Sequence, residues 1–285
     1  MPNPAAPAHP TGPAGRPADR LADVNGVRLA YDVRGQGPLV LCAHGLTSSR
    51  AAEDASALLD HDHIAAAAGR TVARYDARGH GRSQGRPVPD DYRWPALAGD
   101  LLALADLLQP HAPVAGIGAS MGAATLLWAA VREPGRFDRL VLRIPPTAWQ
   151  TRTAQAAVLA QSAKALEQAG LRAWLAAAGP SPQPPLFADD PLPVLPPAVP
   201  EELLPSVLRG AGASDLPDPE DLAKMGVPTL ILAWAGDPGH PVSTAERLAA
   251  LLPAADLHVA TTRAELASWT GRVSGFLAGP GGVLG

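Results

Sequence analysis

One serine lies among small residues at a point where the chain changes character. The stretch GIGASMG, residues 116–122, fits the pattern G-x-S-x-G and joins a strand-like run, APVAGIG, to a helix-like one, MGAATLLWAAVRE. A serine at a sharp strand-to-helix turn lifts its hydroxyl out of the sheet, and such a turn tolerates only small residues such as Gly118 and Gly122. The backbone N–H of Met121 is then free to point at a developing oxyanion. The pattern predicts that Ser120 is a nucleophile, with a plain tight turn as the alternative.

The composition limits the partners on which such a nucleophile would act. The chain has 285 residues, 47% of them hydrophobic, a formal net charge of −4 and no run of basic residues. We therefore expect a small-molecule substrate, and neither nucleic acid nor a membrane surface as a partner. No stretch reaches 18 consecutive apolar residues. The single cysteine, Cys42, lies in the apolar run PLVLCAHG, which favours a small buried side chain in a reducing, cytoplasmic protein. The oligomeric state stays open.

Metal and cofactor chemistry has no signal in the sequence. No pair of His or Cys residues shows the spacing of metal ligands, and GIGASMG lacks the lysine of a phosphate-binding loop. We expect neither a metal nor another cofactor.

The elements that must position Ser120 alternate between strands and helices. An Asn25-Gly26 turn between two short strand patterns predicts a hairpin. Helix patterns cover about 50–60, 94–108, the stretch after Ser120, a stretch opened by Ser243 or Thr244, and ELASWTGRVSGFL, and strand runs lie between them: PLVLCAHG, RTVARY, APVAGIG, RFDRLVLRI, VPTLILAW and ADLHVA. Such alternation predicts an α/β three-layer sandwich, with a mostly parallel sheet and an antiparallel edge hairpin.

One long segment interrupts this alternation. Residues 147–222 contain an Ala-rich helix over about 153–178 and then a dozen prolines between Pro180 and Pro219. Proline lacks an N–H and fixes φ, so this segment cannot join the sheet. We expect a helical, Pro-rich cap at 147–222 on a core made of 21–146 and 223–278, with a surface loop as the alternative. Residues 1–20 and 279–285 are expected to be tails, the first of them disordered.

Three loops together resemble the α/β-hydrolase fold family over roughly residues 21–278. AHGLTSS (43–49) is similar to its His-Gly oxyanion loop, YDARGHGRS (75–83) to its Asp-x-x-Gly-x-Gly-x-Ser loop, and GIGASMG to its nucleophile elbow. The resemblance implies that Leu46 supplies a second oxyanion N–H. It also implies that Asp237, after the strand VPTLILAW, is the acid that orients the catalytic base. His44 and Trp149 are expected beside the substrate, with Trp149 and Trp174 either lining an apolar pocket or only packing.

The histidine of that family is missing from its usual place after the last strand. No residue from 259 to 285 is a histidine. His240 lies three residues after Asp237 and is our first choice as the base, and His258, His44, His80 or no histidine at all remain open. His61 and His63, near the end of a predicted helix, are expected to be solvated.

The resemblance and Ser120 together imply a cofactor-independent serine hydrolase acting on a carboxylic ester, thioester or lactone. Two alternatives follow from the misplaced histidine: a non-hydrolytic cyclase or lyase of the same fold in a biosynthetic pathway, or a ligand-binding protein without a complete triad.

Overall fold

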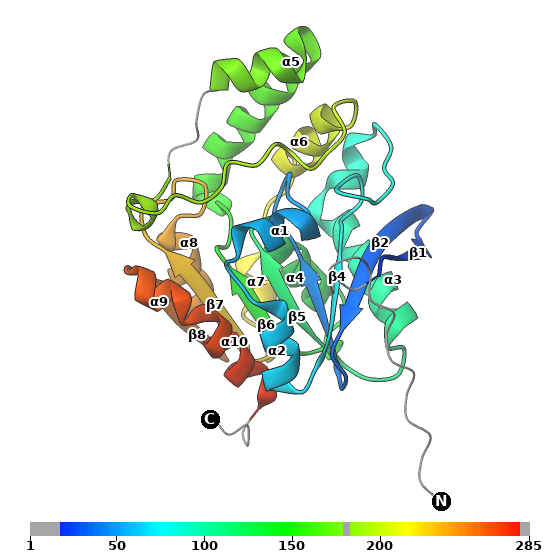
Figure 1. The fold of residues 1–285 in the computed structure, drawn as a ribbon, viewed down its shortest axis with the longest axis vertical. Helices are drawn as coiled ribbons and strands as arrows, with labels where there is room; N and C mark the ends of the chain where they lie inside the picture. The colour runs from blue at the N-terminus through cyan, green and yellow to red at the C-terminus, as the bar shows by residue number, and fades with distance from the viewer. Residues whose placement is uncertain (1–17, 179–182, 280–285) are drawn as a thin grey trace, which may run out of the picture.

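The computed structural model describes residues 18–178 and 183–279, so most of the predicted tails lies outside the described residues. At its centre is an eight-stranded sheet in the order β1-β2-β4-β3-β5-β6-β7-β8 (Figure 1). The strands are β1 (Arg20–Val24), β2 (Val27–Arg34), β3 (Leu39–Ala43), β4 (Thr71–Tyr75), β5 (Val114–Ala119), β6 (Phe137–Arg143), β7 (Thr229–Trp234) and β8 (Ala255–Ala260). In the order of the sheet, every pair of neighbouring strands from β4 across to β8 is parallel. The pairs β1–β2 and β2–β4 are antiparallel. The predicted fold class is confirmed.

The hairpin forms where the dipeptide Asn25-Gly26 predicted it. Both residues have positive φ, 45° and 72°, and Val24 pairs directly with Val27. Two consecutive positive φ values give a turn whose twist matches that of the flanking strands. β2 then pairs with β4 on its other side, which places the hairpin at one edge of the sheet.

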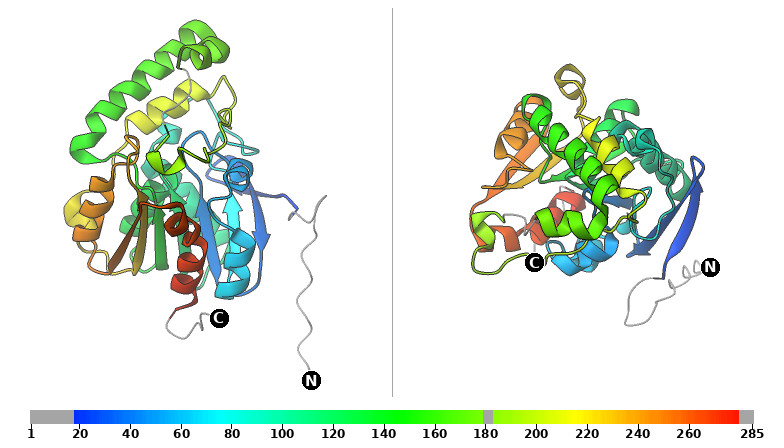
Figure 2. Two further views of the ribbon diagram at one scale, coloured as in Figure 1. Left: turned by 60° about the vertical axis from the view of Figure 1, so that its left-hand side comes forward. Right: turned by 90° about the horizontal axis from the view of Figure 1, so that it is seen from above.

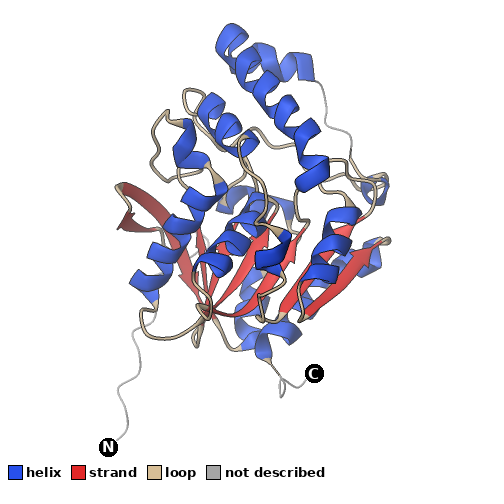
Figure 3. Ribbon diagram, turned by 180° about the vertical axis from the view of Figure 1, so that it is seen from behind, coloured by secondary structure: helices blue, strands red, loops and turns tan. Residues whose placement is uncertain are grey.

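Helices cover both faces of the sheet, as views from opposite sides show (Figures 1 and 3). One face packs against α3 (Trp94–Leu108), α4 (Met121–Arg132), α7 (Pro219–Leu222) and α8 (Val242–Leu251). The other packs against α2 (His61–Ala68), α9 (Arg263–Ala267) and α10 (Trp269–Ala278). Both faces of the central strands are therefore buried, which explains their continuous apolar runs.

Some predicted helix boundaries were wrong. The helix expected over 50–60 ends at Ser56 as α1 (Arg50–Ser56), and a separate α2 begins at His61, capped by the Asp60 side chain. His61 is consequently buried rather than solvated, whereas His63 is exposed. α8 begins at Val242 after Pro241, so neither Ser243 nor Thr244 is its cap. Short-range capping signals compete with one another, and the surrounding packing selects among them.

Segment 147–222 contributes no strand in its described parts, 147–178 and 183–222. It forms η3 (Trp149–Thr151), α5 (Arg152–Ala178), η4 (Pro185–Phe187) and α6 (Leu204–Gly212) before α7. α5 is kinked at Gly170, where φ is 78°. α5 and α6 pack on each other and on Tyr92 of η2 (Pro89–Tyr92) through an apolar cluster separate from the two cores beside the sheet. Both helices lie above the sheet, beyond one end of its strands (Figures 1 and 2).

Candidate active site

Ser120 occupies a strained turn between β5 and α4. Its φ and ψ are 51° and −110°, in a region that non-glycine residues rarely adopt. Its N–H donates to the carbonyl of Arg143 on neighbouring β6 at 3.0 Å, which holds the turn in place. The helix begins at once, since the N–H of Ala124 already bonds to the carbonyl of Ser120 at 3.1 Å. Strain of this kind persists only where the surrounding contacts enforce it.

The two glycines of the motif are required by close backbone approaches. A Cβ at Gly118 would lie 2.4 Å from the carbonyl oxygen of Gly122. A Cβ at Gly122 would lie 2.1 Å from the carbonyl oxygen of Ala43, at the end of β3. Neither neighbour is a flexible side chain, so no larger residue fits without moving the sheet or the helix.

Ser120, His240 and Asp237 form one hydrogen-bonded chain. The Nε2 atom of His240 lies 2.8 Å from Oγ of Ser120, and its Nδ1 lies 2.7 Å from Oδ2 of Asp237. A carboxylate only accepts hydrogen bonds, so Nδ1 carries the proton and Nε2 is left to accept the one on the serine hydroxyl. This is the arrangement in which a histidine removes a proton from serine.

The Asp237 carboxylate is fixed by three donors. Besides His240, the indole N–H of Trp234 donates to it at 3.1 Å and the backbone N–H of Gly239 at 2.9 Å. Burial opposes ionisation, but these hydrogen bonds and the charge of a protonated His240 outweigh it and lower the pKa of Asp237 to about 2. Asp237 is therefore a carboxylate throughout the neutral pH range.

The indole that holds Asp237 is itself held by aromatic packing. Trp234, the last residue of β7, stacks on Trp269 with 5.5 Å between ring centroids, and Phe187 meets it edge-on at 5.1 Å. The loop that carries His240 is tied down from another side, because the N–H of Thr147 donates to the carbonyl of Gly239 at 3.2 Å. Sequence reasoning missed Trp234 and Thr147, since neither belongs to a motif.

Ser120 and His240 open into a cavity of about 330 Å³. Both predicted oxyanion donors, Leu46 and Met121, are among its lining residues. Met121 is the first residue of α4, so its N–H has no partner within the helix. The other lining residues come from the end of β5, from the loops after β3, β6 and β7, and from α1, α3 and α5: Gly45, Ser48, Glu53, Trp94, Ala119, Ile144, Pro146, Thr147, Arg152, Gln155, Leu159 and Gly239.

The structure does not bring His44 or Trp149 into this cavity. His44 is buried, its Nδ1–H donates to the carbonyl of Gly45 at 2.8 Å, and its Nε2 accepts the N–H of Ala77 at 2.9 Å. With both nitrogens used, His44 braces the loop before Leu46 and has no ring nitrogen left to hydrogen-bond a substrate. The indole N–H of Trp149 instead donates to the carbonyl of Pro217 at 3.2 Å, and the residue lies beside the N-terminal half of α8.

The remaining candidate bases, His80 and His258, do not line the cavity around Ser120. His80 is fully buried, and its Nδ1–H donates to the carbonyl of Arg78 at 2.8 Å. Burial, followed by the nearby His44, lowers the pKa of His80 to about 3, so the ring stays neutral. His258 lies within β8, at the edge of the sheet and three strands from β5. Cys42 is buried, and burial raises the pKa of its thiol to about 12, which fits a packing role.

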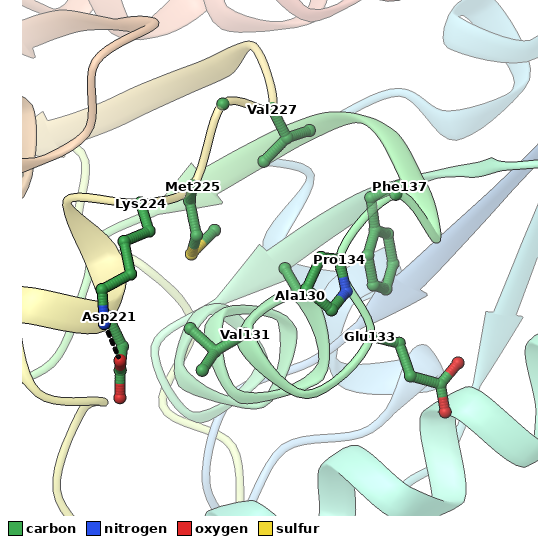
Figure 4. Close-up of a pocket in the computed structure, with 11 residues that line it drawn as sticks. Ala130, Val131, Glu133, Pro134, Phe137, Asp221, Lys224, Met225 and Val227 are labelled. Atoms are coloured by element: carbon green, nitrogen blue, oxygen red, sulfur yellow. Dashed lines mark hydrogen bonds and ion pairs between the residues drawn. The ribbon is translucent and has the colours of Figure 1, made fainter.

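A second cavity, of about 170 Å³, lies at the opposite ends of the strands (Figure 4). Its lining includes Phe137, where β6 begins, Val227, just before β7, and the ion pair of Lys224 and Asp221. It holds no histidine, serine or cysteine. Elsewhere in the described chain, no group of three or more His, Cys, Asp or Glu residues could hold a metal ion, and no described helix is long and apolar enough to cross a membrane.

Known proteins are similar in sequence to parts of this chain. A 3-oxoadipate enol-lactonase 2 from Acinetobacter baylyi is 30% identical over 193 residues, which cover 62% of this chain and 65% of that protein. A monoacylglycerol lipase from Mycolicibacterium smegmatis is 34% identical over 143 residues, covering 44% and 45%. The matches thus span less than two thirds of either relative.

Solved structures share the fold over nearly the whole chain. A hydrolase from Pseudomonas aeruginosa superposes with a TM-score of 0.70 at 24% identity, covering 92% of this chain and 98% of that one. A thermophilic esterase from Thermogutta terrifontis gives a TM-score of 0.71 at 21% identity, covering 91% and 96%. The family model described as the alpha/beta hydrolase fold matches residues 38–195. The chain therefore belongs to the alpha/beta hydrolase fold family.

Proposed function

We propose that this protein is a cofactor-independent serine hydrolase that cleaves a carboxylic ester, thioester or lactone. The observation that carries the proposal is the pair of distances on His240: 2.8 Å from Nε2 to Oγ of Ser120 and 2.7 Å from Nδ1 to Asp237. A hydroxyl, a base and an orienting acid at hydrogen-bond distance are what nucleophilic attack by serine requires. The relatives named as an enol-lactonase, a lipase and an esterase support this bond class.

In the first half of the proposed reaction, Oγ of Ser120 attacks the substrate carbonyl carbon while Nε2 of His240 takes the hydroxyl proton. The carbonyl π electrons move to oxygen, and the backbone N–H groups of Leu46 and Met121 stabilise the resulting oxyanion. When the oxyanion collapses, the bond to the leaving oxygen or sulfur breaks and His240 gives its proton to that atom. Asp237 stabilises the imidazolium throughout and does not itself take the proton.

In the second half, water attacks the acyl group on Ser120. His240 removes a proton from the water, a second oxyanion forms, and its collapse expels Oγ of Ser120, which regains its proton from His240. The products are a carboxylic acid and an alcohol or thiol; a lactone gives a hydroxy acid.

Segment 147–222 serves as the cap in this proposal. Arg152, Gln155 and Leu159 of α5 line the cavity that holds Ser120, so the segment shapes the substrate site. A cavity of about 330 Å³ is at the small end of the usual range for ligand sites, which favours a short acyl or alcohol portion. The single buried Cys42 suits a reducing compartment, and we place the enzyme in the cytoplasm.

A lyase or cyclase, and a ligand-binding protein without a complete triad, were alternatives because no histidine follows the last strand. Nε2 of His240 lies within hydrogen-bond distance of Ser120, so this reason no longer applies, and no observation favours either alternative.

An active-site probe tests the proposal. A fluorophosphonate should label the wild-type protein at Ser120, and p-nitrophenyl butyrate should be hydrolysed. Ser120→Ala should abolish both signals without lowering the melting temperature appreciably. Ser56→Ala is the matched control, because the Ser56 hydroxyl donates to the carbonyl of Glu53 and Ser56 does not line this cavity, so it should keep labelling and turnover. Unchanged turnover in Ser120→Ala would exclude Ser120 as the nucleophile.

A further inference from the structure

The cavity around Ser120 contains one cation that the proposed triad does not use. Arg152, the first residue of α5, lines the cavity and is only 6% exposed. Gln155 and Leu159 follow it on the same face of the helix, three and seven residues later, and also line the cavity. Arginine is among the residues least often buried without a partner.

The partners of Arg152 are all neutral. Its Nε–H donates to the carbonyl of Ser214 at 2.7 Å, one Nη1–H donates to Oγ1 of Thr147 at 3.2 Å, and one Nη2–H donates to the carbonyl of Ala211. The guanidinium also lies over the ring of Trp94, 4.3 Å from its centroid. These contacts fix the plane of the guanidinium and use three of its five N–H groups.

No carboxylate among the described residues forms an ion pair with Arg152. Asp215 follows Ser214 and is near enough for its charge to raise the pKa of Arg152, but its carboxylate accepts the backbone N–H groups of Trp149 at 3.0 Å and Leu216 at 2.7 Å instead. Glu53 lines the same cavity, but it is already paired with Arg143. Among the described residues, the guanidinium of Arg152 therefore has no carboxylate at hydrogen-bond distance.

This arrangement is costly for the free protein. Burial lowers the pKa of Arg152 to about 10, which still leaves it charged at neutral pH. A buried charge without an opposite charge is a source of instability unless a ligand supplies one. The planar guanidinium, with N–H groups still unused, matches a carboxylate in shape as well as in charge.

We propose that the substrate of this site carries a carboxylate at a distance from the scissile bond, and that Arg152 binds it while Ser120 attacks the ester, thioester or lactone carbonyl. This inference rests on the proposed hydrolase function. Arg152 then determines specificity, because a neutral substrate would leave the buried charge unpaired.

Two isosteric substrates test the inference. The mono-p-nitrophenyl ester of glutaric acid carries a terminal carboxylate, and the corresponding ester of its monoamide is neutral and of the same shape. Wild-type enzyme should hydrolyse the charged ester with kcat/KM about 10- to 100-fold higher, the factor expected for hydrogen bonds to a charged group. Arg152→Gln should remove that preference, because it should lower kcat/KM for the charged ester far more than for the neutral one.

Arg209→Gln is the matched control. Arg209 also links α6 to α5, through Glu167, but it lies on the surface and does not line the cavity. It should keep the wild-type preference. Equal kcat/KM values for both esters in the wild type, or equal losses on both in a folded Arg152→Gln, would overturn the inference while leaving the hydrolase proposal intact.

A binding measurement separates the anion site from catalysis. Calorimetry with glutarate and Ser120→Ala protein requires no turnover, so it gives a result even if the hydrolase proposal fails. Glutarate should bind, and the neutral diamide should not. Because Arg152 also joins α5 to α6, Arg152→Gln could fail to fold, and in that case this measurement on protein with Arg152 intact decides. Absence of glutarate binding, or equal binding of the diamide, would contradict the anion site.

Discussion

Oδ2 of Asp237 lies 2.7 Å from Nδ1 of His240, and both residues belong to the loop between β7 and α8. The N–H of His240 also bonds to the carbonyl of Asp237 at 3.2 Å, so one tight turn sets the geometry of the acid and the histidine together. After β8, where the family resemblance placed the base, the chain turns directly into α9 through Thr261 and Thr262. Ser120 reaches this pair from a distant part of the chain, the turn between β5 and α4.

The first prediction is that Asp237 and His240 act as one catalytic unit. His240→Ala and Asp237→Asn should each lower kcat for p-nitrophenyl butyrate by about 10³-fold or more, because each removes the oriented base. Groups that act as one unit are not additive, so the double variant should be little worse than His240→Ala alone. His111→Ala, which removes an exposed histidine, should leave the rate unchanged. Near wild-type turnover in His240→Ala would refute the role of this histidine.

The second prediction concerns the hydrogen bond that the indole N–H of Trp234 donates to Asp237. Trp234→Phe keeps an aromatic ring against Trp269 and Phe187 but removes the indole N–H that donates to Asp237. We expect kcat to fall about 10-fold, as for the loss of one hydrogen bond to a charged group, with KM nearly constant. Steady-state kinetics and a thermal melt distinguish this from general damage, which would lower the melting temperature first.

The third prediction concerns the glycine behind the serine. Gly122→Ala would place a Cβ 2.1 Å from the carbonyl oxygen of Ala43, so we expect a loss of about 3 kcal/mol in the free energy of unfolding and loss of activity. Gly271→Ala in α10 is the control, because nothing lies within 4 Å of the new Cβ. That substitution should stabilise the protein by up to about 1 kcal/mol. Urea unfolding of both variants measures the difference.

The fourth prediction concerns the stability of the fold at acidic pH. Burial lowers the pKa values of His44, His61 and His80, that of His80 to about 3, so all three rings are neutral in the folded protein. In the unfolded chain they take up protons below about pH 6.5. The unfolded state then binds more protons, so stability falls as the pH falls from about 6.5, and for His80 this continues down to about pH 3.

Urea unfolding between pH 6 and pH 4 measures this effect. His80→Asn retains a donor for the carbonyl of Arg78 but does not titrate, so the slope of stability against pH should decrease by about 1 kcal/mol per pH unit. Ile64→Val, at a buried side chain that does not titrate, should lower the stability but keep the wild-type slope. A mere packing defect at His80 would shift the curve to lower stability without changing its slope, and that result would contradict the prediction.

The sequence alone determined the features that depend on neighbours along the chain. The Asn25-Gly26 hairpin, the alternation of strands and helices, and the turn at Ser120 are set by local steric limits and by the period of apolar residues. The glycines at 118 and 122 fit this pattern because the backbones of α4 and β3 approach there.

Only the tertiary structure decided which distant side chains meet. Sequence reasoning left His240, His258, His44 and His80 open, and 120 residues separate His240 from Ser120; the distance between them depends on how β5, β6 and β7 lie side by side. The same holds for His44 and Trp149, whose polar atoms are used by nearby backbone groups, and for Arg152, which belongs to no motif. Side-chain partners across a fold are fixed by packing, and packing is a property of the whole chain rather than of any local pattern.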